Sequence, residues 1–347
     1  MRSEPAERLR ERIRADGPIP FAAFMEEALY GAGGYYAGDE LAIGEDGDFV
    51  TGSSHSPLFG RTTAELLTGL DRELGKPADY LEVGFGTGAH LEAVMESSVG
   101  SRRWLACDRV LRNLPVGIQA SDSLSAWPAR SIEGLIFSYE LLDALPVHRL
   151  KQVEVASRRE LRELHVGLDG ERFVWLELAL SDPSLAGLVP DRLERGQVAD
   201  VAKWARVYRE LTARLGRGLV VTFDYGFERE KLFDPRVRMN GTLACYRRQR
   251  VHRDPFADVG DQDLTAHVDF TALIEAGEGE GLETVALTRQ APWLAALGIL
   301  DGTADRPPAE RLEAMALLDL DGMGEDIRVL VQGRDVDAAR LVDLSLL

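Results

Sequence analysis

The sequence lacks the features of a membrane protein or of a disulfide-stabilised protein. No apolar run approaches the roughly 20 residues that a membrane-spanning helix requires. Only two cysteines, Cys107 and Cys245, occur in 347 residues. They are too few and too far apart for a disulfide framework or a zinc cluster, so we expect no metal site and a reducing, cytoplasmic environment. The arginine-rich start, residues 2–14, also contains three glutamates, which a transit peptide would lack.

Positive charge is scarce as well. The chain has 40 lysines and arginines and 58 acidic residues, which gives a formal net charge of −18. Because lysine and arginine supply the affinity for a phosphate backbone, this charge argues against a nucleic-acid partner. With 45% hydrophobic residues, the chain can bury a full core, and we expect a soluble globular protein of about two domains with no membrane partner. Whether the chain forms a homodimer stays open.

The most informative stretch is 79–91, Asp-Tyr-Leu-Glu-Val-Gly-Phe-Gly-Thr-Gly-Ala-His-Leu. It predicts a buried parallel strand, a glycine turn and a helix that begins near Ala89. Because Gly84, Gly86 and Gly88 carry no side chains, a cofactor can lie against the backbone where the strand ends. Gly84, Gly86 and Ala89 nominally satisfy the nicotinamide-binding pattern, and a tight turn without any ligand is a further alternative.

Two acidic residues favour a methyl donor over a nicotinamide. Glu82 lies two residues before the first glycine, and acid-x-Gly-x-Gly-x-Gly is the first motif of class I methyltransferases, which bind S-adenosylmethionine. Asp108 closes the next predicted strand, 103–107, and follows Gly84 by 24 residues, close to the roughly 20 expected of such a unit. It could hold both ribose hydroxyls. The predicted cofactor-binding residues are Glu82, Gly84, Gly86, Thr87, Gly88, Asp108, Asp122 and Tyr139.

The chain continues as an α/β sheet after Asp108. Residues 134–138 and 219–226 are apolar runs typical of parallel strands that are buried on both faces. Glu140 and Asp143 follow the first of these strands. Since ligands in open α/β sheets lie beyond the carboxyl ends of the strands, we predict that both acids act in catalysis. The alternative is that they complement a helix dipole.

Residues 148–215 have a different pattern. Alternating apolar residues around an Asp-Gly pair predict a hairpin at 164–178, and the spacing over 198–215 predicts a helix that ends at Gly216 and Gly218. We therefore expect a class I methyltransferase Rossmann-like α/β sheet with a helical N-terminal cap and a small α+β insertion that covers the active site. The predicted boundaries are 1–75 for the cap, 76–147 plus 216–347 for the core, and 148–215 for the insertion.

A set of short motifs, in this order, resembles the MidA family, whose mitochondrial members are assembly factors for respiratory complex I. The resemblance implies a class I methyltransferase fold, S-adenosylmethionine as the cofactor, and an activity like that of a protein arginine methyltransferase. This chain departs from the family at 53–55, at Tyr139, and at the turn, where Gly-Phe-Gly-Thr-Gly replaces Gly-Pro-Gly-Arg-Gly. Besides the glycine turn, the motifs lie at 17–21, 34–36, 47–51, 56–60, 140–147, 224–226, 241–243, 263–270 and 322–325.

Three functions remain open. A protein arginine methyltransferase would use Glu140 and Asp143 to orient the guanidinium and accept its developing charge. A small-molecule O-methyltransferase would need a general base such as His267, although the polar run around His267 is also typical of a helix cap. An assembly factor could keep the cofactor without catalysis. The predicted substrate-side residues are Tyr35, Tyr36, Asp48 and His55.

Overall fold

The computed structural model describes residues 4–38, 57–112, 114–191, 193–302, 305–320, 322–343 and 345. The chain divides into two compact units. Unit 1 contains the described residues of Met1–Phe49, Leu142–Trp204 and Phe227–Asp269. Unit 2 contains those of Val50–Leu141, Ala205–Gly226 and Phe270–Leu347. No helix in the described part of the chain is long and apolar enough to cross a membrane.

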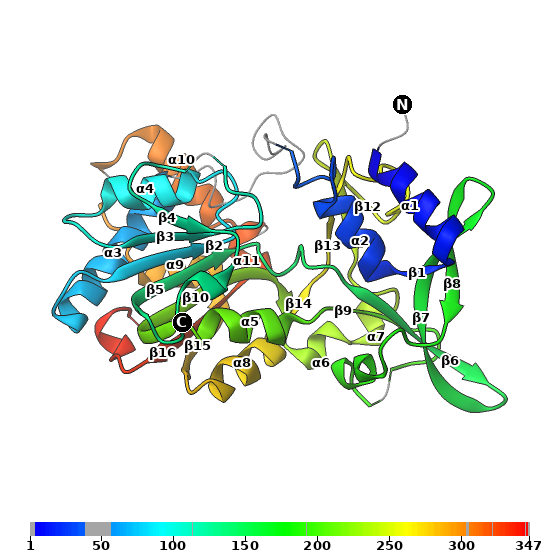
Figure 1. Cartoon of the computed structure of the whole chain (residues 1–347). Helices are drawn as coiled ribbons and strands as arrows, with labels where there is room; N and C mark the ends of the chain where they lie inside the picture. Colours follow the sequence, from blue (N-terminus) through cyan, green and yellow to red (C-terminus); the bar gives the residue numbers. More distant parts are fainter. Residues whose placement is uncertain are drawn as a thin grey trace. The chain divides into compact units, whose positions relative to one another are not determined.

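Unit 2 is organised around a sheet with the strand order β15-β16-β10-β5-β2-β3-β4 (Figure 1). The pairs from β4 to β10 are parallel, and β16 runs antiparallel to both β10 and β15. The strand order reverses at β2, so the carboxyl end of β2 is the topological switch point at which α/β sheets bind ligands. The strands are β2 (Asp79–Val83), β3 (Trp104–Cys107), β4 (Gln119–Ser121), β5 (Ile132–Tyr139), β10 (Leu215–Phe227), β15 (Glu283–Arg289) and β16 (Ile327–Arg334).

Helices cover both faces of this sheet. In Figure 1, α3 and α4 lie on one face and α5 and α8 on the other. The core between α3 and the sheet is aromatic: the ring of Phe59 lies 6.0 Å from that of Phe137 and 5.3 Å from that of Phe223. The helices are α3 (Pro57–Leu74), α4 (Ala89–Ser97), α5 (Trp204–Thr212), α8 (Phe270–Gly279), α9 (Gln290–Ala296), α10 (Pro308–Leu317) and α11 (Met323–Asp326).

Unit 1 contains two antiparallel sheets. The larger sheet has the order β1-β7-β6-β9, with β8 paired to β7, and the smaller has the order β12-β11-β13. The strands of these two sheets are β1 (Ile19–Pro20), β6 (His148–Val155), β7 (Arg158–Asp169), β8 (Arg172–Leu178), β9 (Val198–Val201), β11 (Ala244–Arg247), β12 (Arg250–His252) and β13 (Asp263–Thr265). A further short strand, β14 (Val268–Asp269), belongs to neither sheet. The helices are α1 (Glu4–Asp16), α2 (Phe21–Tyr30), α6 (Arg229–Leu232) and α7 (Pro235–Arg238).

The predicted class I methyltransferase sheet and the hairpin at 164–178 are confirmed, the hairpin as β7 and β8. The division into units differs from the predicted domain boundaries. Helix α3 lies in unit 2 rather than in an N-terminal cap, and residues 227–269 lie in unit 1 rather than in the core. The reason is that the chain leaves the central sheet when β10 ends and returns to it only with β14, α8 and β15.

The predicted helix over 198–215 is wrong at both ends. Residues 198–201 form β9, which pairs with β6, and the helix spans only Trp204–Thr212. Gly216 and Gly218 do not end a helix but lie inside β10. A Cβ atom on Gly218 would lie 1.9 Å from the carbonyl oxygen of Gly134, so glycine is required there for the close approach of β10 and β5.

Candidate functional site

The turn after β2 has a backbone that only glycine adopts readily. Gly84, Gly86 and Gly88 have φ angles of 74°, 55° and 80°, in the left-handed region where a side chain is strained. At Gly84 a Cβ atom would also lie 2.8 Å from Leu141 Cδ1. Gly86 and Thr87 are partly exposed, whereas Gly88 is buried and caps α4. The backbone of the turn is therefore open to a ligand at the switch point of the sheet.

Asp108 reaches the same turn from the end of β3. Its Oδ2 accepts a hydrogen bond from the backbone N–H of Gly86 (3.1 Å), and its Oδ1 accepts one from Val110 (3.3 Å). Burial raises the pKa of Asp108, an effect that these amides and the charge of Arg112 oppose. The backbone N–H of Arg109 is a third donor to this carboxylate, which has about four acceptor positions in all. The geometry thus agrees with a carboxylate that receives hydroxyl donors.

Glu82, the acid of the turn motif, lies in a buried polar cluster. Its Oε2 accepts a hydrogen bond from the hydroxyl of Tyr80 (2.7 Å) and lies 3.0 Å from Nδ1 of His90. On the other side of the ring, Nε2 of His90 lies 3.2 Å from Oγ1 of Thr63. The pKa of Tyr80 is raised well above 10, first by burial and then by the charge of Glu82. The sequence assigned no role to His90, because nothing in its spacing distinguishes it from an ordinary helical residue.

Two other predicted cofactor residues, Asp122 and Tyr139, differ from each other in exposure. Asp122 is exposed directly after β4. Burial raises the pKa of Cys107 to about 12, and the charges of Asp108 and then Asp122 add to this effect. Tyr139 is buried: its hydroxyl donates to Oε1 of Gln290 (2.9 Å), and its ring stacks on that of Phe223 at 5.3 Å. The side chain of Tyr139 thus packs in the core of unit 2, and its predicted role on the cofactor side stays a prediction.

Glu140 has a strained backbone. It follows β5 directly, its N–H donates to the carbonyl oxygen of Phe223 (2.9 Å), and its φ angle is 49°. A non-glycine residue in the left-handed region costs of order 1–3 kcal/mol, and such residues cluster at functional sites. This strain is independent support for the prediction that Glu140 acts at the carboxyl edge of the sheet.

The sequence pattern of a family of S-adenosyl-L-methionine-dependent methyltransferases matches residues 107–288, which is just over half of the chain. The chain belongs to this family. The matched range begins after the glycine turn, so the turn motif and Glu82 are separate observations in favour of the same activity. The protein is therefore an S-adenosylmethionine-dependent methyltransferase, and the predicted family resemblance is confirmed.

Relatives of the methyltransferase are similar over most of its length. The mitochondrial protein arginine methyltransferase NDUFAF7 homolog of Drosophila melanogaster is 26% identical over 337 residues, with coverage of 80% of this chain and 70% of the relative. Protein arginine methyltransferase NDUFAF7 of Homo sapiens, also mitochondrial, is 24% identical, with coverage of 86% and 76%. These names describe the relatives.

Solved structures support the fold. A crystal structure from Burkholderia thailandensis, bound to S-adenosyl-homocysteine, is 30% identical, covers 96% of this chain and 92% of its own, and superposes with a TM-score of 0.85. A native crystal structure from the same organism is 29% identical, with the same coverage and a TM-score of 0.81. The residues of this methyltransferase fit the cofactor, because the open glycine turn lies between two carboxylates that suit its hydroxyl and ammonium groups.

Unit 1 carries a second group of predicted site residues, which we call the acid–tyrosine cluster. The hydroxyl of Tyr36 donates to Oδ1 of Asp263 (2.8 Å), and its ring lies 5.0 Å from that of Tyr35 and 5.6 Å from that of Tyr30. Burial is the main cause of a pKa of Tyr36 well above 10, and Asp263, Tyr30 and Asp143 add to it. The cluster consists of Tyr30, Tyr35, Tyr36, Asp143 and Asp263. The sequence pointed to Tyr35, Tyr36, Asp143 and the polar run that begins at Asp263, and only the structure adds Tyr30.

His267 also lies in unit 1, and its environment disfavours protonation. Burial, followed by the charges of Arg238 and Arg253, lowers the pKa of His267 to about 4. Its backbone N–H donates to Oγ1 of Thr242 (3.1 Å), and its ring lies 5.5 Å from that of Phe227. A histidine with this pKa is a weak base at neutral pH, which favours a structural role over general-base catalysis.

The remaining predictions have separate outcomes. In the polar run around His267, Asp269 pairs through Oδ2 with Nε of Arg229 at 2.9 Å. Asp143 lies in unit 1 and Glu140 in unit 2, and their roles toward the acceptor stay predictions. Asp48 and His55 lie outside the described residues.

Proposed function

We propose that this methyltransferase transfers a methyl group to an arginine of a partner protein. The observation that carries the proposal is the acid–tyrosine cluster, in which the buried carboxylates of Asp143 and Asp263 occur together with three tyrosine rings. Carboxylates pair with a guanidinium through charge-assisted hydrogen bonds, and aromatic faces attract it. The names of the mitochondrial relatives agree with this acceptor class.

The chemistry divides between the cofactor and the chain. Bound S-adenosylmethionine supplies an electrophilic methyl group, so the protein mainly has to hold and orient the nucleophile. In unit 2, Glu140 presents a carboxylate from a strained position that directly follows a central strand. In unit 1, the fixed carboxylates of the cluster would orient a guanidinium and stabilise its charge without reorganising. A strong general base is not required for this acceptor, in keeping with the low pKa of His267.

The test is to identify the atom that receives the methyl group. Purified protein is incubated with radiolabelled S-adenosylmethionine and with arginine-containing peptides, with lysine-substituted peptides as matched controls. We expect label on arginine after acid hydrolysis. Base-labile label, or label on a small molecule, would establish an O-methyltransferase instead. Tight binding of S-adenosylhomocysteine with no transfer to any acceptor would indicate an assembly factor without catalysis.

We further propose that the protein works in a reducing compartment, as a cytoplasmic protein would. Cys107 and Cys245 are both free and buried, and burial raises the pKa of each thiol to about 12, which keeps them in the unreactive thiol form. Fractionation of the producing cell tests the location. Light scattering on purified protein tests the separate proposal of a homodimer.

A further inference from the structure

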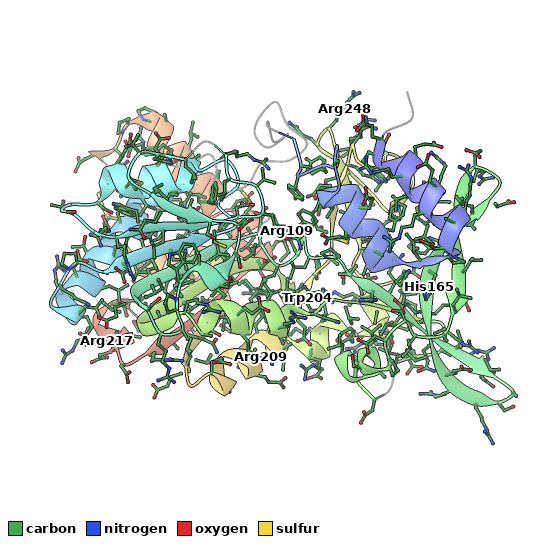
Figure 2. All side chains as sticks on the ribbon, in the orientation of Figure 1. Arg109, His165, Trp204, Arg209, Arg217 and Arg248 are labelled. Carbon is green, nitrogen blue, oxygen red and sulfur yellow. The ribbon has the colours of Figure 1, made fainter. Side chains whose placement is uncertain are left out.

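One segment of unit 1 has a charge opposite to that of the chain. Residues 235–253 contain six arginines and no aspartate or glutamate, although the whole chain has 58 acidic residues and a net charge of −18. The segment forms α7, a loop at 239–243, and the hairpin of β11 and β12. Arg248, labelled in Figure 2, lies at the turn of this hairpin. A local excess of arginine in an acidic protein suggests an anionic ligand.

Part of this segment encloses a cavity of about 530 Å³. We call it the arginine pocket. Four arginines from three different parts of unit 1 line it, together with two apolar residues whose exposed fractions are 70% for Val237 and 36% for Met239. The volume exceeds that of a single carboxylate and lies within the range of ligand-binding clefts. The side chains concerned are Arg149, Arg236, Arg238, Arg253, Val237 and Met239.

A buried carboxylate fixes the wall of the pocket. Asp200 pairs through Oδ1 with Nε of Arg149 at 2.8 Å, and its Oδ2 accepts the backbone N–H groups of Thr242 (2.6 Å) and Leu243 (2.8 Å). Gly241 has a φ angle of 77°, and a Cβ atom there would lie 2.2 Å from Asp200 Oδ2. The loop can therefore approach Asp200 only with glycine at this position, and the wall is preorganised.

The guanidinium charge of Arg253 is oriented rather than neutralised by the residues that the structure describes. Arg149 and Arg236 face the carboxylates of Asp200 and Asp234. By contrast, Nη1 of Arg253 donates to the carbonyl oxygen of Leu243 at 2.9 Å, and among the described residues no carboxylate lies within ion-pair distance of it. A carbonyl oxygen orients a guanidinium without cancelling its charge. The same positive potential lowers the pKa of the neighbouring His267.

We propose that the arginine pocket binds an acidic segment of the acceptor protein. Guanidinium groups recognise carboxylates in a bidentate manner, and the apolar rim would cover the hydrophobic neighbours of the acidic side chains. A nucleic acid fits less well, because the strongly acidic chain repels a continuous phosphate backbone. The proposal rests on the proposed function in one respect: the partner protein that carries the acidic segment is the same protein whose arginine receives the methyl group.

The experiment measures binding without turnover. A fluorescent, end-blocked peptide of alternating glutamate and leucine is titrated with the full chain, and a glutamine–leucine peptide and a single-stranded oligonucleotide serve as comparisons. We expect binding of the glutamate peptide only. Arg236→Glu should weaken it about tenfold or more, and this change should leave folding intact because the Arg236 side chain is 86% exposed. Arg253→Gln should also weaken binding, as a second test of the pocket.

The matched control is Arg195→Glu, which reverses the charge of a side chain that is 78% exposed in the same unit but does not line the pocket. If Arg195→Glu weakens peptide binding as much as Arg236→Glu does, the effect comes from the net charge of the unit and not from the pocket, and the proposal is overturned. Preferred binding of the oligonucleotide would overturn it as well. Once an acceptor is known, Arg236→Glu should raise KM and leave kcat unchanged. If the peptide binds in a way that depends on Arg236 but no arginine is methylated, the proposed function is overturned, whereas the proposal that the pocket binds an anionic ligand still holds.

Discussion

Nδ1 of His90 lies 3.0 Å from Oε2 of Glu82, and both side chains are buried in unit 2. Glu82 is the second-last residue of β2, which leads into the glycine turn, and His90 lies in the first turn of α4. The imidazole is held on its second side by Oγ1 of Thr63 and stacks on the ring of Phe137 at 4.5 Å. His90 is therefore a positioning residue for the acid of the cofactor motif.

The first prediction tests this positioning. His90→Phe keeps an aromatic ring for the stack on Phe137 but removes the hydrogen bond to Glu82, so S-adenosylhomocysteine should bind roughly 10-fold more weakly or worse, as expected for a lost hydrogen bond to a charged group. Thr63→Val removes only the outer contact to His90 and should have a smaller effect. Calorimetry on both variants measures this. An unchanged dissociation constant for a folded His90→Phe protein would contradict the positioning role.

The second prediction concerns the strain at Glu140. Glu140→Gln should lower turnover far more than cofactor affinity, because it removes the charge and keeps the geometry. Glu140→Gly should abolish turnover, yet the protein should be as stable as the wild type or about 1 kcal/mol more stable, because glycine relieves the left-handed backbone but adds entropy to the unfolded chain. Ala156, also at φ 49°, provides the matched control.

Ala156→Gly should give a similar change in stability with unchanged turnover, since Ala156 lies between β6 and β7. Thermal unfolding and initial rates test all three variants. Equal losses of turnover and cofactor affinity in Glu140→Gln would instead assign Glu140 to the cofactor site.

The third prediction concerns the glycine turn. Gly86→Val should abolish binding of S-adenosylhomocysteine, because a branched side chain would occupy the space where the cofactor lies against the backbone. Gly117→Val is the matched control: Gly117 also has a positive φ angle, of 94°, and nothing lies within 4 Å of its Cβ position. Gly117→Val should introduce the same kind of backbone strain but leave the affinity for S-adenosylhomocysteine unchanged. Parallel losses in both variants would mean that strain, not contact, explains the result.

The fourth prediction links His267 to acid stability. The folded protein lowers the pKa of His267 from 6.5 to about 4, so the unfolded chain binds a proton more readily in this pH range. The free energy of unfolding should therefore be unaffected by His267 above about pH 6.5 and fall between pH 6.5 and 4, by up to roughly 3 kcal/mol. His267→Asn should reduce this slope in urea unfolding at pH 7 and pH 5. Parallel slopes in the two proteins would refute the pKa assignment.

The sequence by itself determined the central sheet and the cofactor. Strands β5 and β10 contain nearly continuous apolar segments, because parallel strands in the middle of a sheet are buried on both faces. The acid and the glycines of the turn form a local pattern that spans one strand, one turn and the start of one helix. Such a pattern can be recognised in a sequence because backbone conformation and burial restrict which residue types occur at a position.

Only the tertiary structure decided which polar side chains meet and where some elements end. Thr63 and His90 are 27 residues apart, and Tyr36 and Asp263 are 227 apart, so no local spacing could reveal these contacts. Residues 198–201 are all buried, which is compatible with either a helix or a strand. They form a strand because they pair with the edge of β6. Contacts between distant segments depend on how the chain packs, and packing is a property of the whole fold.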